Sequence, residues 1–164
     1  MPMISEANIV SAVRTISAMD TKKKEILCDE IFVEQPNLLA SVLVQQQMGN
    51  ELQEIDVLLN VLMVLYIAIK ESGHKISKIT ENEQEHQMKL FSATVKSTEG
   101  MKDIFIETSL NKFIEDHKES NLLSYVVGEM RSANFFKNRK ESSKYLIMAG
   151  INLASCIATA KKMA

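Results

Sequence analysis

The sequence predicts an all-α protein, a helical bundle of about seven or eight helices in one domain over residues 1–164. Apolar residues recur at helical spacing through most of the chain, and no stretch alternates with period two for long enough to make a strand. Two prolines and five glycines leave long uninterrupted stretches for helices. Residues 57–69 and 145–160 carry no charge. Because a helix that is apolar on all sides must be covered, we expect these two as largely buried helices.

Composition and charge narrow the classes of function. The net charge is −2, from 19 basic and 21 acidic residues, which gives no indication of nucleic acid or an anionic membrane as partner. Residues 57–69 rise only about 20 Å, against about 30 Å for the bilayer core, so we expect no membrane span. Cys28 and Cys156 stand alone in helical patterns and are interpreted as buried, reduced thiols. No secretory leader is recognised, and we expect a cytoplasmic protein.

The first third of the chain predicts three helices. Ser5 is the expected N-cap of the first helix, which turns Ile9, Val13 and Ile16 inward. A second helix begins after Asp20-Thr21 and ends before Pro36, because the residue before a proline is pushed out of the helical region. Its expected inward residues are Leu27, Cys28, Ile31 and Phe32. Asn37 is the expected cap of a third helix over residues 38–48.

The middle of the chain predicts three more. A fourth helix, over residues 52–72, contains the apolar stretch 57–69 and ends at Gly73. Thr80 and Glu83 form a capping-box pair that begins the fifth helix, whose apolar residues are Met88, Phe91 and Val95. Between residues 99 and 117 the apolar face shifts. We expect one helix there, with a kink or a change of partner near Thr108.

Two helices complete the chain, one from Asn121 and one over residues 142–161. The first turns Leu122, Leu123, Val126, Val127, Met130 and Ala133 inward. The Asn-Leu-Leu sequence at Asn37 recurs at Asn121, and each copy precedes a very apolar helix. An internal duplication of about 21–73 and 99–162 would produce this echo; coincidence is the competing explanation, because no fixed period is present.

Two asparagines and a stripe of small residues are the candidate site residues. Asn60 and Asn152 each lie within one of the apolar helices. A buried amide without a partner costs about 1–3 kcal/mol, so we expect each to have a hydrogen-bond partner. If the two helices pack together, the two amides can bond to each other and fix helix register; the alternative is that they orient a ligand. Gly150, Ala154 and Ala158 recur every four residues. Such a stripe allows a close helix approach, either within the chain or as a twofold dimer seam.

Reactive motifs are few. Glu83 and His86 match the Glu-x-x-His spacing of carboxylate-bridged metal sites, as do Glu71 and His74. Gly73 separates the second pair from its helix, and the first pair lies in a polar helix start that is explained by solvation. His117 is expected to complement a helix dipole near solvent. The basic residues of 137–144, next to two phenylalanines, are interpreted as a solvated connection.

The leading functional hypothesis is a non-enzymatic interaction or adaptor protein that acts through a helix face, with a second copy or another protein as partner. It rests on the scarcity of reactive motifs and on the small-residue stripe. One alternative is a small-molecule-binding bundle with an apolar pocket near Asn60 or Asn152. A second alternative is a metal-dependent enzyme that uses Glu83 and His86. No cofactor is expected under the leading hypothesis.

Overall fold

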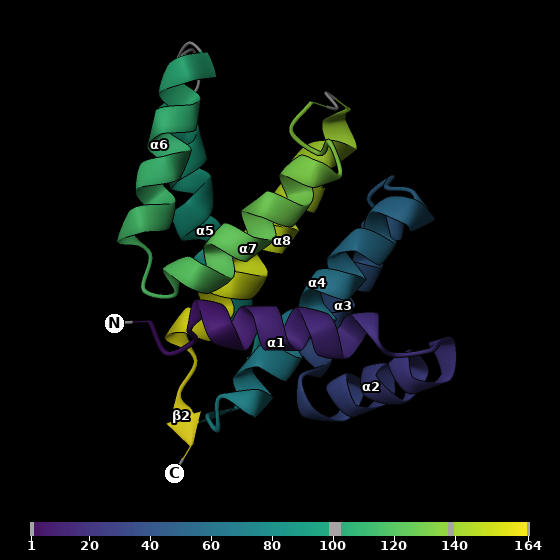
Figure 1. Cartoon of the computed structure of the whole chain (residues 1–164). Helices are drawn as coiled ribbons and strands as arrows, with labels where there is room; N and C mark the ends of the chain where they lie inside the picture. Colours follow the sequence, from purple (N-terminus) through teal and green to yellow (C-terminus); the bar gives the residue numbers. More distant parts are fainter. Residues whose placement is uncertain (1, 99–102, 138–139, 164) are drawn as a thin grey trace.

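A computed structural model describes residues 2–98, 103–137 and 140–163, and the fold is all-α as predicted (Figure 1). The described residues form eight α-helices, one short 3₁₀ helix and a two-residue antiparallel ribbon. The elements are α1 (Glu6–Ser17), α2 (Thr21–Glu34), α3 (Pro36–Leu43), η1 (Val44–Gln46), α4 (Leu52–Glu71), β1 (Lys75–Ile76), α5 (Glu81–Thr98), α6 (Asp103–Asp116), α7 (Ser120–Ser132), α8 (Glu141–Thr159) and β2 (Lys162–Met163).

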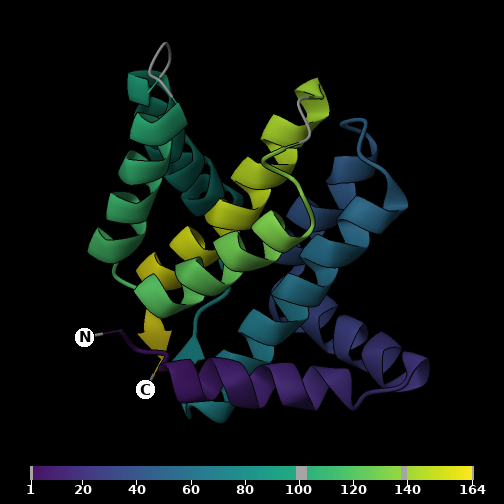
Figure 2. The same cartoon turned by 45° about the horizontal axis from the view of Figure 1, so that its top comes forward.

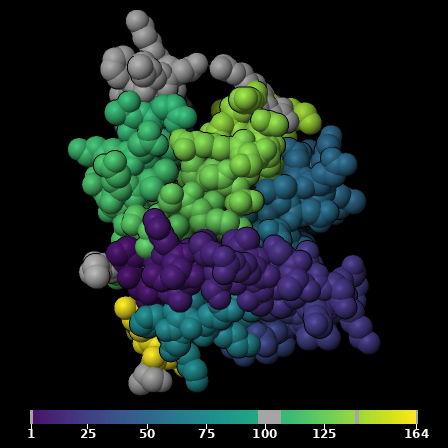
Figure 3. All heavy atoms as spheres, viewed as in Figure 1, coloured from purple at the N-terminus to yellow at the C-terminus, as the bar shows by residue number. Residues whose placement is uncertain are grey.

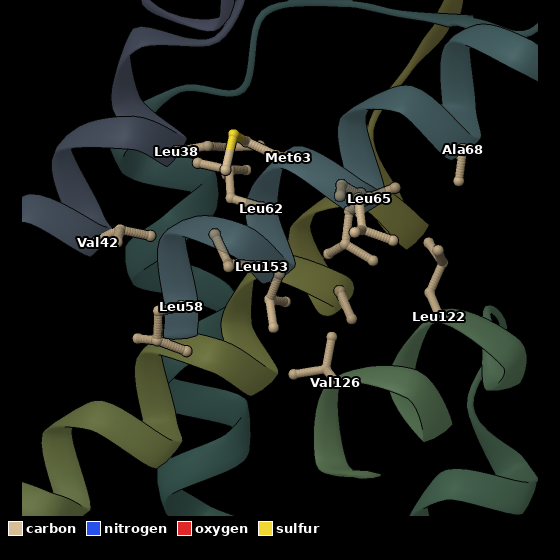
Figure 4. Packing of buried hydrophobic residues seen from close by; sticks show 14 of the residues in the cluster. Leu38, Val42, Leu58, Leu62, Met63, Leu65, Ala68, Leu122, Val126 and Leu153 are labelled. Carbon is tan, nitrogen blue, oxygen red and sulfur yellow. The ribbon is translucent and has the colours of Figure 1, made fainter. Parts of the chain in front are cut away.

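The two apolar helices lie at the centre, as the sequence predicts. Helices α1, α3, α7 and α8 pack against α4, while α5 and α7 pack against α8. Figure 4 shows Leu58, Leu62 and Leu65 of α4 in one cluster with Val126 of α7 and Leu153 of α8. On the surface, α1 forms a continuous band between α7 and the end of α4 (Figure 3). The described helices therefore share one hydrophobic core.

Helix α4 is longer than its uncharged stretch. It has 20 residues, and by length and composition it is the one helix among those described that could cross a membrane. The length argument from residues 57–69 alone was therefore too strict. What makes α4 a core helix is its covering by five neighbouring helices, α2 among them, which bury most of the residues in its apolar stretch.

Two of the predicted caps are confirmed, Ser5 and the pair Thr80–Glu83, and one is wrong. Ser5 and Asp20 accept backbone N–H groups as N-caps of α1 and α2. Thr80 and Glu83 bond reciprocally at the start of α5, as a capping box does. Asn37, by contrast, is not a cap: Gln35 is the N-cap of α3, and Pro36 is its first residue. Proline is well suited to that position because its missing N–H would have no helical partner there.

Three further expectations are corrected. Phe32 points outward and is 65% exposed, while Leu27 and Ile31 are buried. Helix α3 ends at Leu43, not near residue 48, and continues as η1. The last helix ends at Thr159, because the chain becomes extended and pairs β2 with β1. Strands of two residues are too short to show period-two alternation, so no sequence pattern predicts them.

The region 99–117 contains a single helix in its described part. Helix α6 runs without a break through Thr108, as expected. Residues 99–102, at the start of that region, lie outside the described residues.

The start of α3 holds the segment that leads into α5. The buried Gln35 side chain accepts the N–H of Ile79 at 2.9 Å and donates to the C=O of Ser77 at 3.1 Å. Asn37 donates to the C=O of Ile79 at 2.9 Å. Ile79 itself is completely buried. We call Gln35 and Asn37 the first clamp.

The start of α7 holds the N-terminal segment in the same way. The buried Glu119 carboxylate accepts the N–H groups of Met3 and Ile4 at 2.7 and 2.9 Å. Asn121 donates to the C=O of Ile4 at 2.9 Å, and Ile4 is completely buried. Glu119 and Asn121 form the second clamp.

The two clamps are reciprocal. Each holds an isoleucine that directly precedes a helix N-cap, Ile79 before Thr80 and Ile4 before Ser5. The first clamp lies at the start of α3, in the half α1–α4, and holds the start of the half α5–α8. The second clamp lies at the start of α7, in the half α5–α8, and holds the start of the half α1–α4. The internal duplication of about 21–73 and 99–162 stays a prediction, and the clamps suggest α1–α4 and α5–α8 as its units.

Candidate binding sites

The predicted pairing of Asn60 with Asn152 is wrong. Asn152 is buried, 6% exposed, and its Nδ2 donates to the backbone C=O of Gln84 at 3.2 Å. Its Oδ1 is shielded from solvent and has no hydrogen-bond partner within the described chain. Asn60 is half-buried, so its amide can be hydrated. The register role expected of the pair is therefore not supported by a bond between them.

A groove of about 460 Å³ lies between α3 and α5, with α8 beneath it. Asn152 belongs to its lining, together with Ala40, Val44, Met88 and Ser92. This groove is open to solvent, and it places Asn152 beside an open hollow of the surface and not in an enclosed cavity. Asn60 is not part of the lining of this groove.

The stripe of small residues is used inside the chain. Gly150, Ala154 and Ala158 are all buried. A Cβ atom at Gly150 would lie 2.7 Å from Met130 Sδ and 3.2 Å from Leu58 Cδ2. The stripe therefore allows α8 to pack closely against α7 and α4, which is the intramolecular interpretation. Its use as a dimer seam is wrong, because the fold already covers it.

The metal hypothesis gains no support from the geometry. Glu83 accepts the N–H of Thr80 at 2.9 Å, which uses its carboxylate in the capping box. His86 is exposed on the same helix turn. Where the structure describes the chain, no three His, Cys, Asp or Glu side chains gather as potential ligands. Glu71 accepts the hydroxyl of Thr15 at 3.0 Å.

His117 is half-buried, and its expected role as a solvated partner of a helix dipole is wrong. Its Nδ1 accepts the N–H of Glu119 at 3.0 Å, and its ring packs against Phe113, with centroids 5.8 Å apart. Burial lowers the pKa of His117. With Nδ1 as acceptor, the neutral ring carries its proton on Nε2, which lies 3.4 Å from Ser155 Oγ. That tautomer cannot take a proton from Ser155, so the pair is not an activated serine.

The two cysteines differ. Cys156 is buried, and burial raises the pKa of its thiol to about 12. Cys28 is half-buried on α2, where burial and the neighbouring carboxylates of Asp29 and Glu25 raise its pKa. Both thiols are free, and neither is activated as a nucleophile.

The structure contains a hollow of about 430 Å³ that the sequence patterns do not predict, and we call it the α2–α4 hollow. It lies between α2, α4 and the β1–β2 ribbon, with one residue each from α3 and α8. Its apolar lining includes Leu38, Leu62, Ile69 and Ile157. Because five elements contribute, no local motif could have predicted it.

A fixed ion pair forms part of the wall of the α2–α4 hollow. Lys70 Nζ lies 2.9 and 2.8 Å from the two carboxylate oxygens of Glu30. These bonds, with one from the Tyr66 hydroxyl, lower the pKa of Glu30. Burial, followed by the bond to Glu30, raises the pKa of Tyr66. Lys70 Nζ also lies 5.9 Å from the centroid of the Tyr66 ring. The three side chains therefore satisfy one another.

The outer face of α2 carries the most exposed group of large apolar side chains on one helix. Ile26, Phe32 and Val33 are 60%, 65% and 66% exposed. Helix α2 lies at the edge of the molecule in both ribbon views (Figures 1 and 2). The predicted basic cluster of residues 137–144 is only partly described, since Arg139 lies outside the described residues. Within it, Lys140 is 3.5 Å from Glu51 and Phe135 is buried, in agreement with a solvated connection.

Comparison of the chain with protein-family models, with curated protein sequences and with solved structures gave no significant match.

Proposed function

We propose that the chain is a non-enzymatic interaction protein that acts as a homodimer through the outer face of α2. The observation that carries the proposal is the exposure of Ile26, Phe32 and Val33, each at 60% or more. Single exposed apolar residues are normal on a protein surface. Three within eight residues of one peripheral helix are unusual, and such patches mark contact surfaces.

The charges of α2 favour a second copy as the partner. Its first turn carries Lys22, Lys23 and Lys24, and the rest of the helix carries only acidic charges: Glu25, Asp29, Glu30 and Glu34. Two α2 helices that run antiparallel about a twofold axis bring each basic first turn beside the acidic end of the other. The two helix dipoles then also oppose each other favourably.

The size of α2 sets the expected strength of the contact. A helix of 14 residues is about 21 Å long. One helix from each copy buries less than the ~1,200–2,000 Å² of stable interfaces. We therefore expect a micromolar dissociation constant and a monomer–dimer equilibrium that depends on salt.

Sedimentation velocity over the micromolar range tests the dimer. Phe32→Asp and Val33→Asp should leave only monomer. Val10→Asp is the matched control, because Val10 is 49% exposed on α1, away from α2, and this variant should dimerise like the unchanged chain. An unchanged chain that stays monomeric, or a Val10→Asp variant that loses the dimer equally, would refute the proposal.

A charge swap tests the antiparallel arrangement. Lys22→Glu and Asp29→Lys should each weaken the dimer, and the double variant should restore it; both residues are exposed on α2 and neither lines the α2–α4 hollow. The double variant is expected to recover the dimer only if the two positions contact each other across the twofold axis. A double variant that is weaker than both single variants would refute this arrangement.

The small-molecule alternative is supported by one specific observation, the buried and unpaired Oδ1 of Asn152 next to the groove between α3 and α5. Fragments that bind there should lose affinity in Ser92→Trp, which fills the groove, and keep it in Ser11→Trp on the exposed side of α1. Ligand-observed NMR measures both. Equal binding to the two variants would remove this candidate.

A further inference from the structure

We infer that the α2–α4 hollow binds a zwitterionic small molecule with an apolar body, of the chemical class of an α-amino acid with a large apolar side chain. The site is separate from the exposed apolar residues of the α2 outer face, and the inference does not depend on the dimer. It rests on the shape of the hollow and on the charges that its walls leave unpaired.

The size and the floor of the hollow suit a small apolar group. Its volume of about 430 Å³ falls within the ~300–1,000 Å³ of small-molecule sites. The side chains of Leu38, Leu62 and Ile157, all buried, contribute the apolar lining. An apolar ligand body placed there leaves water in the way that a core side chain does.

One part of the wall of the α2–α4 hollow is formed by charged side chains that are already paired with each other. Glu30 accepts two bonds from Lys70 and one from Tyr66, so this group needs no ligand to satisfy it. Its side chains are held in one arrangement by bonds among themselves. A ligand therefore finds Glu30 and Lys70 already bonded to each other, on side chains that are 40% and 57% exposed.

Two opposite charges at the hollow have no ion-pair partner within the described residues. Glu34 comes from α2 and Lys75 from β1, so the two charges belong to different walls. The lining carries two carboxylates, Glu30 and Glu34, and two ammonium groups, Lys70 and Lys75, with His74 beside them. Its formal charge is balanced when His74 is neutral.

A zwitterion matches this balance better than an ion of one sign. An ammonium group can donate to Glu34 while a carboxylate accepts from Lys75, each at about 2.8 Å as charge-assisted hydrogen bonds are. Glu34 and Lys75 are both exposed, so a ligand with only one of these groups forms one charge-assisted hydrogen bond fewer and leaves the other protein charge hydrated.

Three probes with one apolar body test the inference: L-phenylalanine, 2-phenylethylamine and 3-phenylpropanoate. Titration calorimetry is done at a protein concentration at which sedimentation shows monomer. We expect L-phenylalanine to bind at least about tenfold more tightly than either analogue, which corresponds to one lost charge-assisted bond. Equal affinities for all three probes, or no binding of any, would overturn the inference.

Two charge-removing variants add a crossed readout. Glu34→Gln should weaken L-phenylalanine and 2-phenylethylamine but not 3-phenylpropanoate, whereas Lys75→Met should weaken L-phenylalanine and 3-phenylpropanoate but not the amine. Glu25→Gln and Lys78→Met are the matched controls, since neither residue lines the hollow. If both test variants bind every probe as the controls do, the site is wrong.

The dimer and the ligand site can fail separately. Phe32→Asp removes the proposed dimer contact but lies outside the hollow, so it should leave the affinity for L-phenylalanine unchanged. Loss of ligand binding with an intact dimer refutes only the zwitterion site. A monomeric chain that binds L-phenylalanine as predicted refutes only the dimer.

Discussion

Replacing Glu119 by glutamine is a test of why the second clamp uses a carboxylate. The segment held there presents two N–H donors, from Met3 and Ile4, at 2.7 and 2.9 Å from the two carboxylate oxygens. Glutamine is nearly the same size but has one oxygen and one NH₂ group. One of the two backbone N–H groups would then face another donor, in a place where Glu119 is only 2% exposed.

The magnitude follows from the bond that is lost. A buried donor left without an acceptor costs about 1–3 kcal/mol, and bonds to charged groups lie in the upper part of that range. For a chain of this size, each kcal/mol lowers Tm by roughly 2–4 °C. We therefore expect Glu119→Gln to lower Tm by roughly 2–12 °C.

Urea unfolding followed by circular dichroism, together with thermal unfolding, measures the effect. Glu115→Gln is the matched control, because Glu115 is exposed on α6 and should change stability by less than about 0.5 kcal/mol. If Glu119→Gln were as stable as Glu115→Gln, the two hydrogen bonds would contribute nothing, and the explanation of the second clamp would be wrong.

Three further predictions concern the first clamp, the helix packing and the pH dependence of folding. Gln35→Glu should destabilise the fold by about 1–3 kcal/mol, because a carboxylate oxygen would replace the NH₂ group that donates to the backbone C=O of Ser77. A urea-unfolding midpoint equal to that of the unchanged chain would contradict this prediction. Gly150→Ala should lower Tm, because overpacking costs about 1–3 kcal/mol while the better helix propensity of alanine stabilises by only about 1 kcal/mol. Gly128→Ala should raise Tm, because there is open space around its Cβ. A Tm change of the same sign in both variants would refute the packing argument. Burial lowers the pKa of His117 in the folded chain, so the unfolded chain binds a proton more readily. Stability is therefore lost as the pH falls from the ordinary histidine pKa of about 6.5 towards the lower pKa of the folded state. His117→Gln should reduce this loss in urea unfolding, and His86→Gln on the exposed side of α5 should not.

The parts of the fold that sequence predicts depend on neighbours within a turn or two. The N-cap Ser5 and the pair Thr80–Glu83 are visible in the sequence because a cap bonds to a backbone N–H about three residues away. The two central helices are visible because their apolar residues are continuous. These features need no knowledge of the rest of the chain.

What the sequence could not provide depends on distant partners. Asn37 has the composition of a cap, but it bonds to Ile79, which is 42 residues away. Phe32 fits an amphipathic pattern that Leu27 and Ile31 also fit, and only the packing of α2 at the edge decides which side is covered. Asn60 and Asn152 look alike in sequence and differ because one is half-buried and the other buried.

The α2–α4 hollow shows the same limit for function. Glu30 and Lys70 lie 40 residues apart, and neither belongs to a recognisable motif. Their ion pair and the unpaired Glu34 and Lys75 become a candidate site only when α2, α4 and the ribbon are brought together. The candidate residues that the sequence did suggest were chosen for being unusual in their helices, and most of them serve packing.

The reciprocal clamps have a consequence for how the chain assembles. The start of α3 holds the segment before α5, and the start of α7 holds the segment before α1. The clamp that holds the first segment of each half therefore lies in the other half. Neither half completes its fold alone, and folding is expected to be cooperative over the whole chain. The same bonds can form between the first half of one molecule and the second half of another, with the connection between α4 and β1 as the hinge. Reciprocal clamping thus provides a route to domain-swapped dimers in which every native contact is kept.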